Sequence, residues 1–146
     1  MNSERTPSFA EGGCLCGAVR YRVSGAPRSS SVCHCRSCRL AAGAPAVGWV
    51  VFDAGHVRLL QGKPAAHHSS PNVVRSFCPR CGTPLSYRNA DAPDEIELTT
   101  ATLDHPELFP PTREIWLEQH IAWQPVNREL PQHPHGSDEP PPTASP

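Results

Sequence analysis

The chain has 146 residues, enough for one domain, but 18 prolines and a hydrophobic fraction of 38% leave it a lean core. Its 13 Lys and Arg residues against 14 Asp and Glu residues give a formal net charge of −1. This balance argues against binding of a nucleic-acid backbone, which requires clustered basic side chains.

The first part of the chain predicts a lead-in followed by a strand. Residues 1–11 are polar and contain no apolar signal-peptide core, so we expect a flexible lead-in and a cytoplasmic protein. From residue 12 to 23, apolar residues alternate with polar ones, which is typical of a strand with one face toward water. Residues 25–31 combine Gly, Ala, Pro and several serines, and they predict a connector.

The middle of the chain predicts an all-β fold with few helical turns. Residues 36–42 are expected to form one short helical turn that ends before Gly43. Short β-rich runs bounded by Gly and Pro then predict strands at residues 46–52, 57–60, 73–77, 85–87 and 95–100. Runs of this length are typical of a sandwich or of folded antiparallel sheets. The longest stretch poor in charge, residues 40–52, is too short to span a bilayer, so we expect no membrane partner.

The C-terminal part predicts the end of the folded domain. Residues 114–123 fit a strand and then a bend, in which Trp116 and Trp123 are expected to supply large buried surfaces. Beyond residue 127 the composition becomes polar and rich in proline, which predicts a disordered tail over residues 128–146 that leaves His133 and His135 solvated. The predicted domain therefore spans residues 12–127.

All seven cysteines lie in three tight clusters: Cys14 and Cys16; Cys33, Cys35 and Cys38; Cys78 and Cys81. An odd number with C-x-C and C-x-x-C spacing indicates metal binding in a reducing compartment and no disulfide framework. The two pairs can form one closed four-thiolate zinc site, which is normally structural. The triplet leaves a three-thiolate site with an open position, which is the arrangement that zinc catalysis uses. We therefore expect two Zn²⁺ per chain.

The local spacing suggests how each cluster grips its metal. Cys14 and Cys16 are two residues apart on the predicted strand, so both side chains should lie on the same face. The run Cys78-Pro79-Arg80-Cys81-Gly82 has the shape of a zinc knuckle, in which the glycine allows a tight turn. A site built from both pairs would join the first strand to the middle of the sheet.

The triplet leaves several possibilities open. Cys33 and Cys35 share a face if the chain is extended, and Cys38 returns to them after a turn. His34 should point the other way, which makes it a poor fourth ligand but a reasonable group behind the metal or beside a substrate. The alternatives are a degenerate site without metal, an iron–sulfur cluster, which requires four ligands, or a site closed by a distant histidine: His56, His67, His68, His105 or His120.

A three-thiolate zinc predicts a reaction of thiols. Such a zinc is thiophilic, and its natural fourth ligand is a substrate thiol that loses its proton on binding. The expected partners are therefore a small thiol and a small electrophile such as an aldehyde. Arg39 and Arg75 lie near the clusters and could bind the carboxylates of the thiol. A solvated strand face or a salt bridge explains each arginine equally well.

Three further residues are weaker candidates for the site. Trp49 could line a pocket, although core packing is the more common role of a tryptophan. Asp104 and His105 stand before Pro106 in an expected turn, and a turn explains Asp104 about as well as catalysis does.

Read together, the cysteine motifs resemble the family of glutathione-dependent formaldehyde-activating enzymes. The resemblance covers about residues 12–123, most of the chain. Its motifs read GCLCGAVRY from Gly13, CHCRSCR from Cys33 and RSFCPRCGT from Arg75, followed by LDHP from Leu103 and Ile115-Trp116. The resemblance implies a zinc-stabilised all-β fold similar to that of Mss4. It further implies a structural zinc on Cys14, Cys16, Cys78 and Cys81 and a catalytic zinc on Cys33, Cys35 and Cys38.

The resemblance also implies carbon–sulfur lyase chemistry that joins formaldehyde and glutathione into S-hydroxymethylglutathione. Some relatives, similar to centromere protein V, are binding proteins, so the alternative is a zinc-stabilised protein-binding module without catalytic turnover. A third hypothesis, a zinc ribbon that binds nucleic acid, is suggested by the Cys78–Cys81 knuckle but lacks a basic patch.

Overall fold

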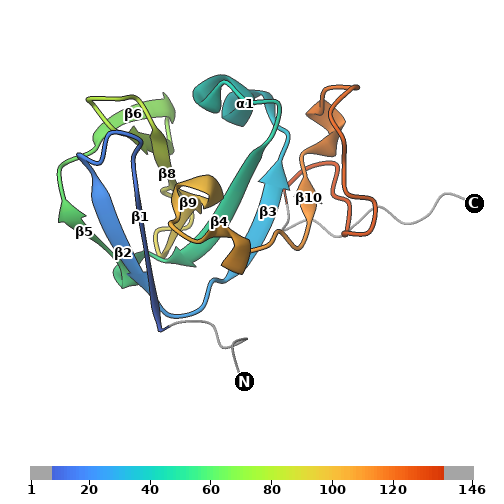
Figure 1. Ribbon diagram of the computed structural model, residues 1–146. Helices are drawn as coiled ribbons and strands as arrows, with labels where there is room; N and C mark the ends of the chain where they lie inside the picture. Colours follow the sequence, from blue (N-terminus) through green and yellow to red (C-terminus); the bar gives the residue numbers. More distant parts are fainter. Residues whose placement is uncertain (1–7, 137–146) are drawn as a thin grey trace, which may run out of the picture.

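A computed structural model describes residues 8–136 and places their strands in two sheets, which confirms the predicted all-β class (Figure 1). The small sheet has the order β1-β2-β5 and contains β1 (Phe9–Gly13), β2 (Arg20–Ser24) and β5 (Val57–Gln61). The large sheet has the order β10-β3-β4-β9-β8-β7-β6. Its strands are β3 (Ser29–Cys33), β4 (Val47–Asp53), β6 (Ala65–Ser70), β7 (Val73–Phe77), β8 (Pro84–Asn89), β9 (Glu95–Thr99) and β10 (Glu114–Ile115).

The strands pair antiparallel within the described residues, except for the short parallel pairing of β10 with β3. One α-helix, α1 (Arg36–Ala42), confirms the helical turn predicted there. The remaining helical pieces are short 3-10 turns: η1 (Ala54–His56), η2 (Thr100–Thr102), η3 (Pro106–Leu108) and η4 (Leu117–Gln119). No helix in residues 8–136 has the length and apolar character needed to cross a membrane.

The strands expected from short apolar runs are found as β4, β5, β7, β8 and β9, each with ends within two residues of the prediction. The continuous strand predicted over residues 12–23 is wrong, because a turn separates β1 from β2. The serines at 29–31, predicted as a connector, begin β3, and β6 had no sequence signal. β1 also starts at Phe9, inside the predicted lead-in; residues 1–7 of that lead-in lie outside the described part.

Strand β4 separates two apolar clusters because its side chains alternate between the faces of the large sheet. Val50 and Phe52 are fully buried in the main core, between the two sheets, where they meet residues such as Val23 of β2. Val47 and Trp49 lie on the other face, in a smaller cluster beneath α1. The small sheet therefore covers one face of the large sheet, and the helix lies over the opposite face.

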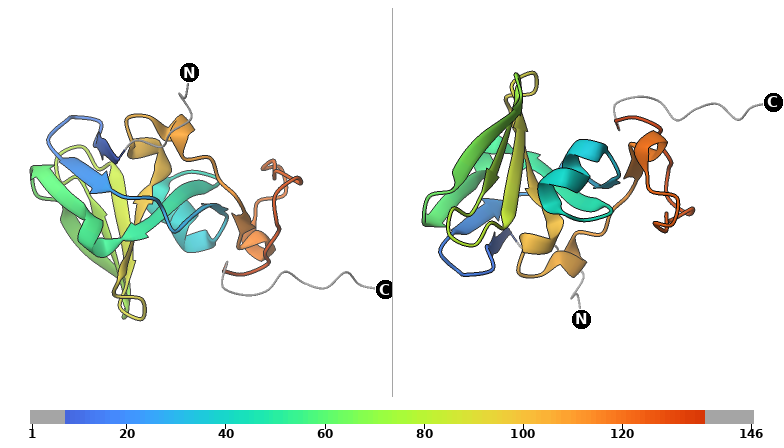
Figure 2. Two further views of the ribbon diagram at one scale, coloured as in Figure 1. Left: turned by 90° about the horizontal axis from the view of Figure 1, so that it is seen from below. Right: turned by 90° about the horizontal axis from the view of Figure 1, so that it is seen from above.

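Helix α1 stands at the end of the large sheet where β3 stops and β4 starts (Figure 1). It begins after Cys35 and ends at Gly43, whose left-handed backbone (φ 63°) donates its N–H to the Arg39 carbonyl at 2.7 Å. Seen from above, α1 lies between strands β6–β8 and the segment that follows β10 (Figure 2).

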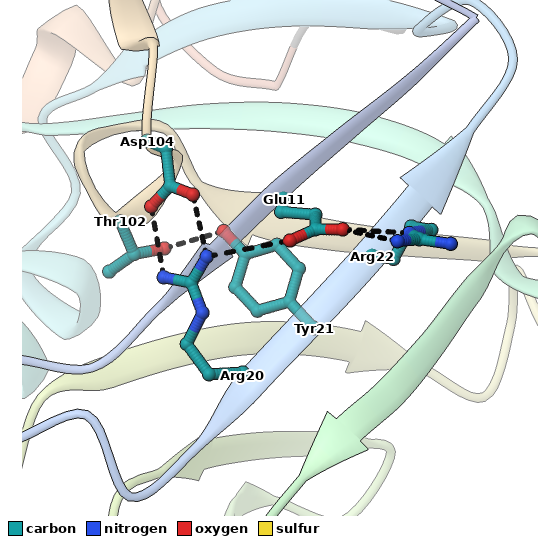
Figure 3. Close-up of polar contacts among 6 residues, drawn as sticks. All are labelled: Glu11, Arg20, Tyr21, Arg22, Thr102 and Asp104. Carbon is teal, nitrogen blue, oxygen red and sulfur yellow. Dashed lines mark hydrogen bonds and ion pairs between the residues drawn. The ribbon is translucent and has the colours of Figure 1, made fainter.

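A polar network fastens the β1–β2 hairpin to the residues after β9 (Figure 3). Arg20 forms two hydrogen bonds with Asp104, at 2.9 and 2.6 Å, and the buried Tyr21 hydroxyl lies 2.8 Å from Thr102 Oγ1. The Glu11 carboxylate lies between two arginines: its Oε1 is 3.8 Å from Arg20 Nη2, and its Oε2 is 2.5 Å from Arg22 Nη2. These contacts hold the strand that leads into Cys14 against the large sheet.

The chain after β10 folds back along that strand. The His133 N–H donates to the Glu114 carbonyl, and the Trp116 N–H donates to the His135 carbonyl, both at 2.9 Å. His133 is buried, which corrects its predicted place in a solvated tail. Trp123, expected to be buried, is 72% exposed, while Trp116 is partly buried. Residues 131–135 of the predicted tail thus form backbone hydrogen bonds with residues 114–117, and residues 137–146 lie outside the described part.

Candidate metal centres and active-site pocket

Four cysteines from distant parts of the chain form one compact thiol group. The sulfurs of Cys14, Cys16, Cys78 and Cys81 all lie within 4.8 Å of one another. The Cys14–Cys16 and Cys16–Cys78 sulfur distances are 3.6 and 3.8 Å. Sulfurs about 2.3 Å from a tetrahedral zinc stand about 3.8 Å apart. The donor set and its spacing therefore fit a closed four-thiolate metal site.

The Cys78–Cys81 half of this group is a tight turn whose N–H groups point at sulfur. The backbone N–H groups of Arg80 and Cys81 both lie 3.4 Å from Cys78 Sγ. Gly82, with φ 82°, then donates its N–H to the Cys78 carbonyl at 2.9 Å. A residue with a side chain rarely adopts this φ, so the glycine allows the turn that brings the Cys81 thiol to the Cys78 thiol.

The Cys14–Cys16 half is also a turn, and the prediction that both residues lie on a strand is wrong. The Gly17 N–H donates to the Cys14 carbonyl at 3.2 Å, and the Val19 N–H lies 3.2 Å from Cys14 Sγ. Thr83 connects the two halves: its Oγ1 accepts the Leu15 N–H at 3.0 Å and lies 3.1 Å from Cys81 Sγ. The hydrogen bond with Thr83 is the main reason that the pKa of Cys81 is lowered, to about 5.

The second thiol group consists of Cys33, Cys35 and Cys38, whose sulfurs also lie within 4.8 Å of one another. Within residues 8–136 no fourth cysteine, histidine or carboxylate joins this group. The distant histidines considered as closing ligands therefore do not complete it. The geometry offers three sulfur donors and leaves the remaining side of the site without a protein ligand from the described residues.

The start of α1 brings the three thiols together. Cys35 is the N-cap residue, with extended backbone, and its Sγ accepts the Cys38 N–H at 3.3 Å. This hydrogen bond turns the chain so that Cys38 returns beside Cys33 at the end of β3. Hydrogen bonds from Cys33 and Cys38 lower the pKa of the Cys35 thiol to about 2.

A pocket of about 290 Å³ opens over this triplet. Its floor contains the three cysteines, and its walls come from α1, from strands β4 and β6–β9, and from the β10 segment. The polar wall residues are Ser37, Ser69, Ser70, Arg75, Tyr87, Glu97 and Gln119; the apolar ones are Trp49, Val73, Ile115 and Trp116. The thiol group is thus reachable from a cavity large enough for a small peptide-like thiol.

Arg75 is the cationic side chain among the residues that line this pocket. Both of its terminal nitrogens lie 3.7 Å from Cys38 Sγ, and its Nε donates to Ser69 Oγ at 3.0 Å. Its guanidinium also stands over the Tyr87 ring, 5.1 Å from the ring centroid. These contacts hold a positive charge beside the sulfurs. Arg39, the other candidate arginine, does not line this pocket.

The remaining sequence candidates divide between the pocket and distant positions. Trp49 both packs in the core, where it is 4% exposed, and lines the pocket, which are the two roles considered for it. Asp104 is engaged with Arg20, which lowers the pKa of the Asp104 carboxyl through their hydrogen bonds. His105 is exposed beside Glu107, at 3.4 Å. Neither Asp104 nor His105 lines the thiol pocket.

His34 points away from the thiols, as predicted, but it is not a substrate-side group. The side chain is fully buried, and its Nε2 lies 2.6 Å from Glu114 Oε1. The other oxygen of Glu114 accepts the Asn127 N–H at 3.1 Å. His34 also donates its backbone N–H to the Ile115 carbonyl at 3.1 Å. This buried pair therefore joins the Cys33–Cys35 segment to the strand and loop that form one wall of the pocket.

The Glu114→Gln variant is expected to lower the free energy of unfolding by about 2 kcal/mol, because Gln has one acceptor oxygen where Glu114 presents one oxygen to His34 Nε2 and the other to the Asn127 N–H. Urea unfolding monitored by circular dichroism measures this loss. The matched control is Glu118→Gln, since Glu118 is exposed and pairs with His135 at the surface; its cost should stay below about 1 kcal/mol. Equal costs for the two variants would contradict a structural role of the buried pair.

Several pocket residues were not predicted from the sequence, because they are distinguished by their backbone conformation or by their contacts in the folded chain. Trp116 has a left-handed backbone, with φ 58° and ψ 38°, and is the non-glycine residue with positive φ among those described. Such strain persists only where neighbouring contacts impose it, and it turns the chain from β10 into the pocket wall. Gln119 Oε1 accepts the Arg36 N–H at 2.7 Å and so joins this wall to the start of α1.

Comparisons with known proteins identify the family of the chain. The sequence profile described as "Glutathione-dependent formaldehyde-activating enzyme" matches residues 9–119. A Halomonas elongata protein, provisionally named a glutathione-dependent formaldehyde-activating enzyme, is 32% identical over 125 residues, which cover 77% of this chain and 78% of that protein. An uncharacterized lyase of Schizosaccharomyces pombe is 33% identical over 85 residues, covering 57% of this chain and 61% of that protein.

A structural relative supports the fold. The crystal structure of a Rhodobacter sphaeroides protein matches with a TM-score of 0.56 and 21% sequence identity, covering 64% of this chain and 87% of that chain. The profile match includes the first two cysteine clusters and the Cys78–Cys81 knuckle, and thus every residue of both thiol groups. On this evidence the chain belongs to the family of glutathione-dependent formaldehyde-activating enzymes.

Proposed function

We propose that this protein is a zinc-dependent carbon–sulfur lyase that activates a thiol, in the first instance glutathione, for addition to formaldehyde or another small aldehyde. The observation that carries the proposal is the thiol triplet at the floor of an accessible pocket, without a fourth ligand among the described residues. The family supports the kind of reaction. The four-cysteine group would hold a second, structural zinc.

When bound to Cys33, Cys35 and Cys38, zinc would supply a thiophilic centre at which a substrate thiol loses its proton at neutral pH. In the reaction, the thiol sulfur forms a bond to the carbonyl carbon, the carbon–oxygen double bond becomes a single bond, and the oxygen gains a proton. The release of the aldehyde is the reverse of these changes. No oxidant or reductant is needed in either direction.

The side chains around the triplet suit a charged peptide-like thiol. The Arg75 guanidinium balances the negative charge of the sulfurs at 3.7 Å and could also bind a substrate carboxylate. Ser37, Ser70 and Gln119 provide further hydrogen-bonding groups in the pocket. Trp49 lies in the apolar wall, which limits the access of water to the sulfurs.

The Arg75→Met variant is expected to lower kcat/KM for glutathione by about 10- to 100-fold, because a hydrogen bond to a charged group contributes about 1.5–3 kcal/mol. Loss of carboxylate binding should appear mainly in KM, whereas loss of charge balance at the sulfurs should appear in kcat. Arg39→Met is the matched control and should change kcat/KM by less than about threefold, since Arg39 does not line the thiol pocket. Equal effects of the two substitutions would contradict the role of Arg75.

The direct test of the proposal is the visible spectrum of the cobalt-substituted protein during titration with glutathione and a panel of other thiols. A new sulfur-to-cobalt band that saturates with added thiol is the expected result, and the thiol that binds most tightly would identify the preferred partner. An unchanged spectrum with both sites loaded would contradict the proposal. It would favour the alternative of a zinc-stabilised protein-binding module. The cytoplasmic location and the absence of nucleic-acid partners stay predictions.

A further inference from the structure

A second pocket, of about 350 Å³, lies beside the thiol pocket and differs from it in character. Its apolar lining comes from the end of α1, the start of β4, and the strands β7 and β8, namely from Ala41, Ala42, Val47, Phe77 and Pro84. The proposed binding of a polar thiol makes no use of these apolar residues. It lies on the same face of the large sheet as the triplet, next to α1.

The two pockets meet at Cys38, Trp49 and Arg75, which line both of them. Cys38 is one of the three sulfur donors, so the second pocket begins at the thiol group itself. Arg75 is held in this dividing position by its contacts with Cys38 and Ser69. A molecule whose sulfur reaches the triplet from the polar pocket can therefore extend a substituent on that sulfur into the apolar pocket.

The size of the second pocket exceeds what a one-carbon substrate can use. A buried apolar cavity of about 150 Å³ is enough to bind benzene, and this pocket has about 350 Å³. Formaldehyde would leave these apolar walls in contact with water. An aliphatic or aromatic group of about six carbons would instead displace that water, and the removal of apolar surface from water favours binding.

We infer that the second pocket is a subsite for the apolar substituent of a larger aldehyde, so that the carbonyl substrate class extends to aliphatic and aromatic aldehydes. This inference rests on the proposed function. The reaction is balanced as for formaldehyde: the thiol sulfur bonds to the aldehyde carbon, the thiol proton ends on the aldehyde oxygen, and the product is a hydroxyalkyl thioether. The apolar substituent on that carbon lies next to the sulfur and so faces the second pocket.

The test measures binding without turnover. Glutathione and its S-methyl, S-butyl and S-hexyl thioethers, which are stable analogues of the products, are titrated into the metal-loaded protein by calorimetry. Each buried methylene contributes about fourfold in affinity, so S-butylglutathione is expected to bind at least about tenfold more tightly than S-methylglutathione. The rate of adduct formation with butanal or hexanal, followed by exchange NMR, should also exceed the rate with acetaldehyde.

Substitutions on α1 identify the pocket that is used. Ala41→Phe fills the second pocket from an exposed helix position, and Ala42→Leu fills it from a partly buried one. Each is expected to abolish the gain from the longer alkyl chain while glutathione itself still binds. Leu40→Phe is the matched control, since Leu40 is 63% exposed and lines neither pocket. It should preserve the dependence on chain length.

Three outcomes would overturn the inference. An affinity that does not depend on the alkyl chain, with normal binding of glutathione, would refute the subsite and leave the proposed function intact. A dependence on chain length that survives both Ala41→Phe and Ala42→Leu would place the substituent elsewhere. Failure of glutathione and of every thioether to bind would refute the proposed function together with the inference.

Discussion

The Cys78→Ser variant is expected to lose one bound metal and at least about 5 kcal/mol of unfolding free energy, since structural zinc contributes about 10–16 kcal/mol in zinc-finger peptides. Cys78 is fully buried, and its sulfur receives N–H groups from Arg80 and Cys81. Serine offers a poor ligand for zinc in place of the thiolate. The loss should be large because this group joins the turn after β1 to the turn after β7, which are far apart in sequence.

For a domain of this length the expected loss corresponds to a fall in Tm of about 10–20 °C. Metal analysis and thermal unfolding by circular dichroism measure the two effects in one preparation. Cys35→Ser serves as the control, because it removes one thiol from the other group. A Cys78→Ser protein with the parent Tm would show that the four-cysteine group does not hold a structural metal.

The Cys35→Ser variant is expected to lose at least about 100-fold in turnover while its Tm stays within a few degrees of the parent. Loss of groups that merely support metal ligands already costs about 10–100-fold in metal affinity or activity, and Cys35 belongs to the donor set itself. The fold should survive because Cys35 is the N-cap of α1. Serine is a favoured N-cap residue, so its hydroxyl can accept the Cys38 N–H in place of the sulfur.

Cys35→Ala separates the two roles of this residue. It should lose as much turnover as Cys35→Ser and in addition about 1 kcal/mol of stability, because alanine cannot cap the helix. Turnover is measured as the rate of adduct formation between glutathione and formaldehyde, and metal content is determined for each variant. Retained turnover in Cys35→Ser with full metal loading would contradict a catalytic triplet.

The elements that the sequence predicted well carry strong local signals. Helix α1 is preceded by Cys35 at its N-cap and ends at Gly43, whose left-handed backbone stops the helix. Strands such as β4 and β7 are rich in valine and aromatic residues and are bounded by turn residues. In these segments the intrinsic preference of the residues and their tertiary environment favour the same structure, so prediction from the local sequence is correct.

The missed elements have little preference of their own and depend on their neighbours. β3 begins with three serines, yet it pairs with β4 along its whole length and buries Ser30 and Ser31. β6 is polar and largely exposed, and it forms through pairing with β7 at the edge of the sheet. These two strands are stabilised by hydrogen bonds to an adjacent strand, because their own side chains have little preference for β structure. Such bonds leave no pattern in the local sequence.

The two tryptophans of the C-terminal segment show the same limit. Both were expected to be buried, but Trp116 lies in the pocket wall and Trp123 is 72% exposed. Their difference arises from contacts with a later part of the chain: the Trp116 N–H donates to the His135 carbonyl, and its ring packs against the His135 ring. Residue type predicts that a tryptophan favours burial, but only tertiary contacts select which one is buried.

By itself, the sequence determined the all-β class, the helix that ends at Gly43 and the grouping of the seven cysteines, because metal-ligand spacing and turn residues act over a few positions. The tertiary structure alone decided the surroundings of the thiols. It placed Arg75 beside Cys38, buried His34 against Glu114 and formed a polar and an apolar pocket that meet at Cys38. The physical reason is that these neighbours come from strands distant in sequence, which meet only when the two sheets pair and pack.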